Sequence, residues 1–334
     1  MNTGLINESE STKSLRKTQI RQFLKRMGSV IGLLGLSLML TVASPHFLTM
    51  DNIMNVARQS AINSLIAIGM LLAILTAGID LSVGSILALS TVMMGIVVVK
   101  MGMSPLIGIV VCLGIGILLG FLNGVMLTKL CLPHPFISTL GTMNVARGLA
   151  LIVTAASPIS NFPTSIQFLG ATFLGPVPVS FILVLVVYIL FHIFLNYTAV
   201  GRYIYAVGGN PEATRLSGIS IDKVLIIVYT ISGLMAALAG LVLVGRVNSA
   251  YPLAGLGYEF DAIAACIIGG ASFMGGEGTV WGTLIGAMIM AVLRNGLNLL
   301  SVSSEMQTVA IGIVIILAVY VDVLRHKAAA RVKA

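Results

Sequence analysis

Charged residues are scarce in this chain. Asp, Glu, Lys and Arg make up only 9% of its 334 residues, whereas a typical soluble domain is about 25% charged. A water-soluble globule is therefore excluded. The apolar segments are long, and the following stretches contain no charged residue: 27–50, 59–79, 81–99, 101–128, 148–201 and 224–245. Because a helix needs about 20 mostly apolar residues to cross a bilayer, these stretches indicate a protein with many membrane-spanning helices.

The chain also lacks the motifs of soluble enzymes. It contains neither the phosphate-binding pattern GxxxxGK followed by Ser or Thr nor the zinc-binding pattern HExxH. The segment around Ser272 resembles a nucleophile elbow, but Met274 stands where the second glycine is required. We therefore expect no catalytic residue, no metal and no cofactor, and any ATP-driven process would need a separate ATPase.

The chain also lacks paired cysteines and the alternating pattern of a β-barrel, which limits the possible fold classes. The three cysteines, Cys112, Cys131 and Cys266, have no paired or metal-like spacing and lie in or beside apolar segments, so we interpret them as packing residues. The apolar segments also lack the alternation of a transmembrane β-barrel, since stretches such as Val224–Val228 are apolar throughout. An all-α transmembrane bundle remains.

The apolar segments predict about ten spans. We expect them near residues 27–44, 55–77, 81–99, 105–128, 136–155, 179–195, 224–244, 262–275, 279–299 and 306–323. This divides the chain into an N-terminal tail (1–26), a transmembrane domain (27–323) and a C-terminal tail (324–334). An even number of spans places both tails on the same side of the membrane.

The placement of the basic residues predicts the orientation. Six of the 19 lie in the first 26 positions and four in the last ten. Cytoplasmic loops carry the excess of Lys and Arg, so we expect both termini in the cytoplasm. The expected location is the bacterial inner membrane. The inner side then also receives Lys129, Arg202, Arg215 and Lys223. The net charge of +8 is thus explained by topology, and we expect no nucleic-acid partner.

With this orientation, the longest polar segments fall on opposite sides. Residues 156–178 and 245–261 form outer loops, where a solute or a partner would arrive first, and 196–223 form an inner loop. Glycines recur at close-packing spacing within the spans, which predicts tight helix contacts at Gly114, Gly116, Gly120 and Gly124, and at Gly282 and Gly286. The segment Gly78–Leu87 also resembles Gly276–Ile285, which hints at an internal repeat.

Few ionisable residues lie within the predicted spans. Arg147 and Arg294 are expected to contact carbonyl groups or to line a polar cavity. Asp80 allows two interpretations: it could bind a coupling ion at membrane depth, or a helix could start here, with Asp80 or Ser82 accepting backbone N–H bonds. The candidate pathway or structural motif consists of Asp80, Ser82, Gly84 and Ser85.

A polar island at residues 201–219 interrupts the apolar sequence. Asn210 is a good N-cap, Pro211 suits the first helical position and Gly218 suits the end, so a helix of about two turns is predicted after a turn at Gly208-Gly209. Two interpretations remain: a helix gripped by another protein, or one lying on lipid. The candidate docking residues are Asn210, Pro211, Glu212, Ala213, Thr214, Arg215, Leu216, Ser217 and Gly218.

The island resembles the cytoplasmic EAA-x3-G loop of ATP-binding-cassette importer permeases, with Glu212-Ala213 and Gly218 at matching positions and Thr214 in place of alanine. Three segments are similar to the ribose-type monosaccharide branch of these permeases: Gly78–Ser85 (GIDLSVGS), Gly201–Asn210 (GRYIYAVGGN) and Asn295–Leu300 (NGLNLL). The resemblance extends from about residue 30 to 324.

By this resemblance, the chain is the permease subunit of a sugar importer. Its partners would be a cytoplasmic ATPase that grips the short helix, a periplasmic sugar-binding protein, a second permease copy and membrane lipid. The alternatives are an ion-coupled sugar carrier, which needs no ATPase, and a channel or purely structural membrane subunit.

Overall fold

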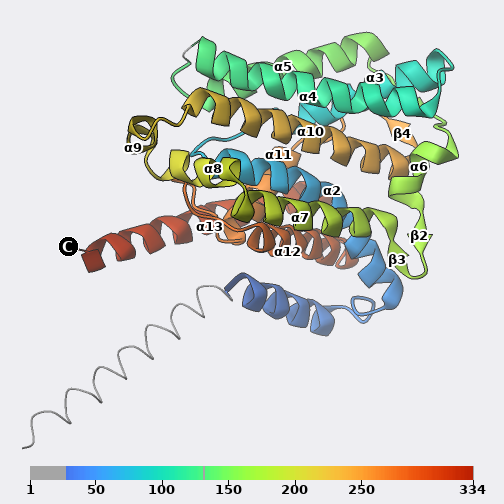
Figure 1. The fold of residues 1–334 in the computed structure, drawn as a ribbon. Helices are drawn as coiled ribbons and strands as arrows, with labels where there is room; N and C mark the ends of the chain where they lie inside the picture. Colours follow the sequence, from blue (N-terminus) through green and yellow to red (C-terminus); the bar gives the residue numbers. More distant parts are fainter. Residues whose placement is uncertain (1–27, 131, 334) are drawn as a thin grey trace, which may run out of the picture.

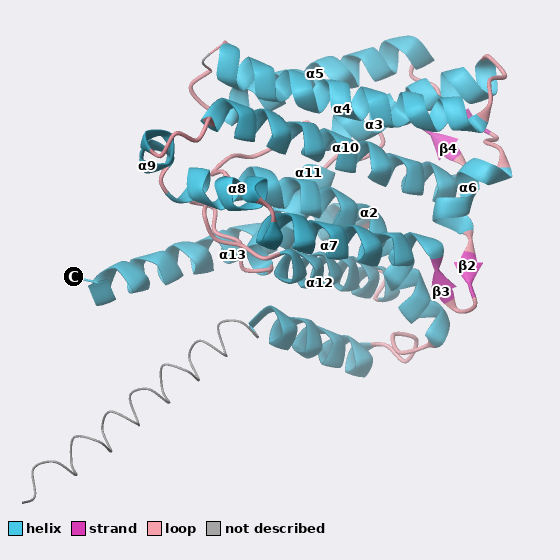
Figure 2. Cartoon of the chain, viewed as in Figure 1, coloured by secondary structure: helices cyan, strands magenta, loops and turns pink. Residues whose placement is uncertain are grey.

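The computed structural model describes residues 28–130 and 132–333, and the predicted N-terminal tail (1–26) and Cys131 lie outside them. The described chain is mainly helical, with four two-residue strands at one end (Figures 1 and 2). After a first helix at Gly28–Ala43, the helices are α2 (Met50–Leu75), α3 (Val83–Gly95), the π-helix η1 (Ile96–Lys100), α4 (Pro105–Lys129), α5 (Pro135–Thr154), α6 (Thr164–Ala171), α7 (Val179–Tyr197), α8 (Ala199–Gly209), α9 (Pro211–Leu216), α10 (Ile221–Val247), α11 (Tyr258–Ile268), α12 (Val280–Leu299) and α13 (Ser304–Lys333). The strands are β1 (Ile159–Ser160), β2 (Phe173–Leu174), β3 (Val177–Pro178) and β4 (Ser249–Ala250).

Eight of the described helices are long and apolar enough to cross a membrane: α2, α3 with η1, α4, α5, α7, α10, α12 and the Ser304–Leu324 part of α13. The predicted all-α membrane bundle is confirmed. The helix Gly28–Ala43 matches the first predicted span but is shorter than these eight. Helix α13 continues as far as Lys333, beyond the predicted boundary at 323.

Short polar sequences set the starts of several helices. Thr49, Ser104 and Thr279 each accept a backbone N–H bond at the start of α2, α4 and α12, as N-caps do. Pro105 and Pro135 occupy the first turns of α4 and α5, where a missing N–H costs nothing. The starts of α4, α5 and α12 lie within one residue of their predicted positions, whereas α2 begins at Met50, before its predicted start at 55.

The bundle has two distinct ends, which we name the strand end and the α9 end. Figure 1 shows the long helices side by side, with the strands and α6 at one end and α9 and the C-terminus at the other. At the strand end, β1 pairs antiparallel with β4 and thereby joins the two predicted outer loops. The hairpin of β2 and β3 lies at the same end, between α6 and α7.

Helices α2 and α10 form the centre of the bundle and run in opposite directions. Helix α2 packs on α10, α11 and α12, and α10 packs on α2, α3 and α4. The packing is thus repeated, with α2–α5 corresponding to α10–α13. This correspondence differs from the repeat suggested by the sequence, because Gly78–Leu87 leads into α3 whereas Gly276–Ile285 leads into α12.

One predicted span is much shorter in the structure. The segment 262–275 contains only the last part of α11, an 11-residue helix of about 16 Å at 1.5 Å per residue, which is too short to cross a bilayer. The chain leaves the helix at Gly269, and Gly270, Gly275 and Gly276 have positive φ angles in the loop that follows. Glycine favours such a break because it adopts this conformation without strain.

The predicted close contacts at the α4 glycines are present, with one exception. A Cβ on Gly116 would overlap the carbonyl of Gly233 in α10, and a Cβ on Gly120 would overlap the carbonyl of Tyr229. Gly124 lies similarly close to Ile226, whereas Gly114 faces open space. In α12, Gly282 and Gly286 lie against the backbone of α11 and its end. Small residues thus let the helix backbones approach each other.

This difference within α4 gives a first prediction. We expect Gly120→Ala to lower the free energy of unfolding by about 1–3 kcal/mol, because the methyl group must displace backbone. Gly114→Ala on the same helix is the matched control and should be neutral or stabilise by up to about 1 kcal/mol through helix propensity. Thermal unfolding of the purified variants in detergent measures both. Equal stability of the two variants would contradict the proposed contact.

Candidate functional site

The predicted short helix in the inner loop is present as α9. The Asn210 side chain accepts a hydrogen bond from the backbone N–H of Ala213 at 3.0 Å, and Pro211 occupies the first turn. Gly218 has a φ of +79° and ends the helix, where the Ile219 N–H donates to the Thr214 carbonyl at 3.3 Å. The predicted local geometry is therefore confirmed, including both caps.

Most of α9 faces outward. The side chain of Leu216 is 81% exposed, and Glu212 and Arg215 form an exposed ion pair at 2.6 Å. Thr214 is the buried member, and its hydroxyl donates to the Asn210 carbonyl at 2.8 Å. The helix thus presents an apolar side chain next to a pair of opposite charges, at the margin of the molecule (Figure 1).

A second helix precedes α9, and the sequence reasoning missed it. The predicted turn at Gly208-Gly209 is wrong, since both residues belong to α8. Gly208 is required for packing, because a Cβ there would overlap the carbonyl of Leu75 and approach the amide of Gly276. The buried residues Gly201, Ile204 and Val207 recur every three positions, and this spacing was the signal that could have identified the helix.

Helix α8 connects α9 to the interior of the bundle. The Tyr205 hydroxyl donates to the Gly278 carbonyl at 2.9 Å, and burial raises the pKa of this phenol, so it stays a donor. The Gly276 N–H in turn donates to the Leu75 carbonyl at the end of α2, also at 2.9 Å. Helix α8, which leads into α9, is thereby held against the end of α2 and the loop between α11 and α12.

The second predicted group of residues lies inside the bundle, around Asp80. This carboxylate is fully buried. It accepts hydrogen bonds from the backbone N–H of Ser82 at 3.0 Å, from the Ser82 hydroxyl, and from the Ser232 hydroxyl of α10 at 2.7 Å. Asn123 of α4 donates to Ser82 at 2.9 Å and accepts from Thr142 of α5 at 2.6 Å.

This network favours one of the two interpretations of Asp80. Both carboxylate oxygens accept hydrogen bonds, and the side chain binds the backbone where α3 begins, as the helix-start interpretation requires. Of the two predicted acceptors, Asp80 accepts a backbone N–H, whereas Ser82, the N-cap residue of α3, donates its hydroxyl to Asp80 and makes no cap bond. Residues of four segments converge here on one buried carboxylate.

The other two residues of the motif have different surroundings. Gly84 lies against the carbonyl of Gly255, where no Cβ would fit. Ser85 is buried, and its hydroxyl has no partner among the described residues. Only Asp80 and Ser82 therefore share a polar network, and a role of the motif in a transport pathway stays a prediction. The described residues contain no group of three or more His, Cys, Asp or Glu placed to hold a metal ion.

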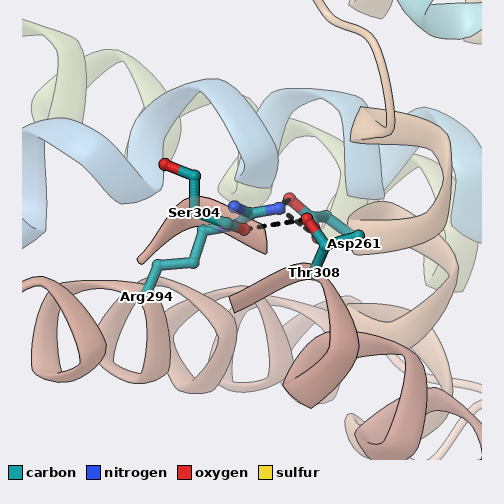
Figure 3. A network of polar contacts seen from close by, with 4 residues as sticks. All are labelled: Asp261, Arg294, Ser304 and Thr308. Carbon is teal, nitrogen blue, oxygen red and sulfur yellow. Dashed lines mark hydrogen bonds and ion pairs between the residues drawn. The ribbon is translucent and has the colours of Figure 1, made fainter. Parts of the chain in front are cut away.

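The arginines within the spans have polar partners. Arg147 donates to the carbonyls of Pro252 and Ala254 at 2.7 and 2.8 Å. Arg294 of α12 forms an ion pair with Asp261 of α11. Its Nε and Nη2 atoms lie 2.7–3.0 Å from the carboxylate oxygens. Figure 3 shows this pair beside Ser304 and Thr308 at the start of α13. Arg147 thus has the carbonyl partners that were predicted, and Arg294 has a carboxylate partner.

Some of these partners were missed or misplaced at the level of sequence. Asp261 was expected in an outer loop, but it is buried in the first turn of α11. Asn123, Thr142 and Ser232 were not singled out, although polar side chains inside charge-free spans often form contacts between helices. Cys112 and Cys266 are buried free thiols, as expected of packing residues.

The buried network yields a second prediction. Ser232→Ala should lower the free energy of unfolding by about 1–3 kcal/mol, because it leaves a buried carboxylate oxygen without its donor. Ser90→Ala is the control, since Ser90 is also buried but its hydroxyl has no partner among the described residues, and its removal should be nearly neutral. Thermal unfolding in detergent compares the two, and equal losses would contradict a special role for Ser232.

Comparisons with known proteins place the chain in a family. Residues 52–319 match the family model described as the permease component of branched-chain amino acid transport systems. The ribose import permease RbsC of Escherichia coli is 43% identical over 315 residues, which are 93% of this chain and 98% of that protein. RbsC of Bacillus subtilis is 44% identical over 301 residues, or 90% and 93% of the two chains.

The fructose import permease FrcC of Rhizobium meliloti is 40% identical over 284 residues, which cover 82% of this chain and 78% of that protein. No solved structure matches the chain. Because the family model covers most of the sequence and the two ribose permeases align over nearly their whole length, the chain belongs to this family of transport-system permease components.

Proposed function

We propose that the chain is the permease subunit of an ATP-binding-cassette importer that carries a monosaccharide across the bacterial inner membrane. Identity of 40–44% with ribose and fructose import permeases, over most of the chain, carries the proposal. The chain lacks a phosphate-binding motif of the GxxxxGK type, so ATP would be hydrolysed by a separate subunit. Transport then requires a mechanical contact between that subunit and this one.

Helix α9 is the proposed contact. A short helix with an exposed leucine fits a groove on a partner protein, where a buried apolar anchor supplies most of the binding energy. It is too short, at six residues, to bind a lipid surface through an apolar face. Closure of the ATPase would push α9, and the motion would pass to α7 and α10 along the chain and through α8 to the end of α2.

The orientation follows from this role. The α9 end would face the cytoplasm, as the basic residues there also favour, and both termini would lie on that side. The strand end would then face the periplasm and receive a sugar-binding protein. We propose that a second permease copy and lipid cover the outer helices, because the apolar windows of α4, α5, α7 and α13 are only 17–33% buried within this chain.

The test is a change at the exposed leucine of α9. Leu216→Glu should reduce ATP-driven ribose uptake at least tenfold in proteoliposomes that contain the permease, its ATPase and the binding protein, since loss of a central apolar anchor costs about 2 kcal/mol or more. Leu130→Glu introduces the same change at another exposed leucine at the α9 end and should keep most of the activity.

Two outcomes would contradict the proposal. The first is unchanged coupling of ATP hydrolysis to uptake in the Leu216→Glu variant. The second is uptake of the sugar by the permease alone under a proton gradient without ATP, which would identify an ion-coupled carrier instead.

A further inference from the structure

The chain between β4 and α11 turns back into the bundle. Residues 251–257 belong to no helix or strand. Gly255 in this segment lies against Gly84 in the first turn of α3, since a Cβ on Gly255 would be 2.9 Å from the Gly84 carbonyl oxygen. At the other end of α3, Gly95 lies against Ile159 of β1, the strand that pairs with β4. The helix rises about 16 Å between Gly84 and Gly95, at 1.5 Å per residue, so the segment reaches from the strand end to membrane depth.

The backbone of this segment is only partly satisfied within the chain. The Arg147 side chain of α5 donates to the carbonyls of Pro252 and Ala254 at 2.7 and 2.8 Å. The N–H groups of Leu253 and Leu256 have no hydrogen-bond partner among the described residues. Non-helical backbone at membrane depth is tolerated only where protein encloses it or water reaches it, because an unpaired polar group in lipid costs several kcal/mol. Lipid is therefore excluded from this segment.

Three large apolar side chains of the same region are exposed. Leu253, Leu256 and Phe260 are 53%, 72% and 52% exposed, and we name them the apolar ridge. Because apolar side chains favour burial away from water and lipid is excluded here, the ridge requires a second protein surface. Helix α7 differs, since its exposed residues, such as Leu190, belong to a regular helix whose backbone is paired internally, as lipid requires.

The neighbouring face of α5 also has the properties of a protein contact. Gly141 and Gly148 have open space where a Cβ would lie, and Asn144 is exposed between them. These positions are three and four residues apart, so they share one face of the helix. Small residues let another helix approach closely, and an exposed amide within a span favours a polar partner over lipid. Arg147, one turn from Asn144, binds the segment, so this face and the ridge adjoin.

We propose that the apolar ridge meets the same ridge of a second permease copy and closes the solute pathway between the two copies as an apolar gate. The inference rests on the proposed function and names the surface that the second copy covers. In a two-fold symmetric pair, residues close to the axis face their own counterparts. A constriction of apolar side chains blocks water and polar solutes until it is widened. Separation of the two ridges would therefore open the pathway, while the α5 face maintains contact between the copies.

The experiment tests the ridge by cysteine cross-linking in proteoliposomes that contain the permease, its ATPase and the binding protein. Cys112, Cys131 and Cys266 are first replaced by alanine. Oxidation of the Leu256→Cys variant should link two permease copies and reduce ATP-driven ribose uptake by about tenfold or more, because the gate is then held closed. A reductant should restore uptake. Leu190→Cys in α7 is the matched control, since Leu190 is also exposed, at 58%, and should neither link the copies nor lose uptake.

A gate gives a second readout that a static contact does not. A charged thiol reagent that does not cross membranes should modify Leu256→Cys faster while ATP and ribose drive transport than at rest. Leu253→Cys decides the question if Leu256→Cys does not assemble. Linking no greater than that of Leu190→Cys would overturn the proposal, as would a linked Leu256→Cys complex that transports at the full rate. Failure of the wild-type complex to transport any sugar with ATP would instead overturn the proposed function.

Discussion

The break between α2 and α3 turns the chain back into the bundle, and its backbone must be enclosed by protein. Water is absent from the hydrocarbon of a bilayer, so each unpaired N–H or C=O there costs several kcal/mol. The carboxylate of Asp80 accepts a hydrogen bond from the backbone N–H of Ser82 at this break. Asn123 of α4 donates to the Ser82 hydroxyl, and Ser232 of α10 donates to Asp80. At the end of α2, the Leu75 carbonyl accepts a hydrogen bond from the N–H of Gly276, which lies in the loop between α11 and α12. These contacts supply polar partners at both ends of the break, next to the central helix α2.

Enclosing α2 divides the helices into an inner and an outer group. The apolar window of α2 is 83% buried and that of α10 is 61% buried, whereas α4 is only 22% buried. Helix α4 nevertheless approaches α10 closely, because Gly116 and Gly120 leave room for the α10 backbone. One face of α4 is thus made of small residues for contact with protein, and the other carries large apolar residues such as Leu118 and Phe121. The buried carboxylate of Asp80 and its partners lie in the interior that this arrangement encloses.

Helix α2 links the two ends of the bundle. Gln59 and Asn63, in the first half of α2, line a polar cavity nearer the strand end, and Leu75, at the other end of α2, contacts Gly208 of α8 and the loop that precedes α12. A continuous helix is stiff along its axis because every residue is hydrogen-bonded to the next turn. Displacement of α8 by a partner at α9 would therefore reach the strand end through α2 as well as through α10. The contacts of α8 with the end of α2 thus join the proposed docking helix to the centre of the bundle.

The sequence by itself determined the class of protein, most of the spans and the local form of α9. These features depend on neighbouring residues: apolar runs long enough to cross a bilayer, an Asn-Pro start and a glycine end. Tertiary structure alone decided the features that join distant segments. Gly208 reads as a turn residue until Leu75 is placed against it, and Asp261 reads as a loop acid until Arg294 pairs with it across α11 and α12. Hydropathy records how well each residue tolerates lipid, but it does not record which polar groups meet inside the bundle, and that pairing alone makes their burial possible.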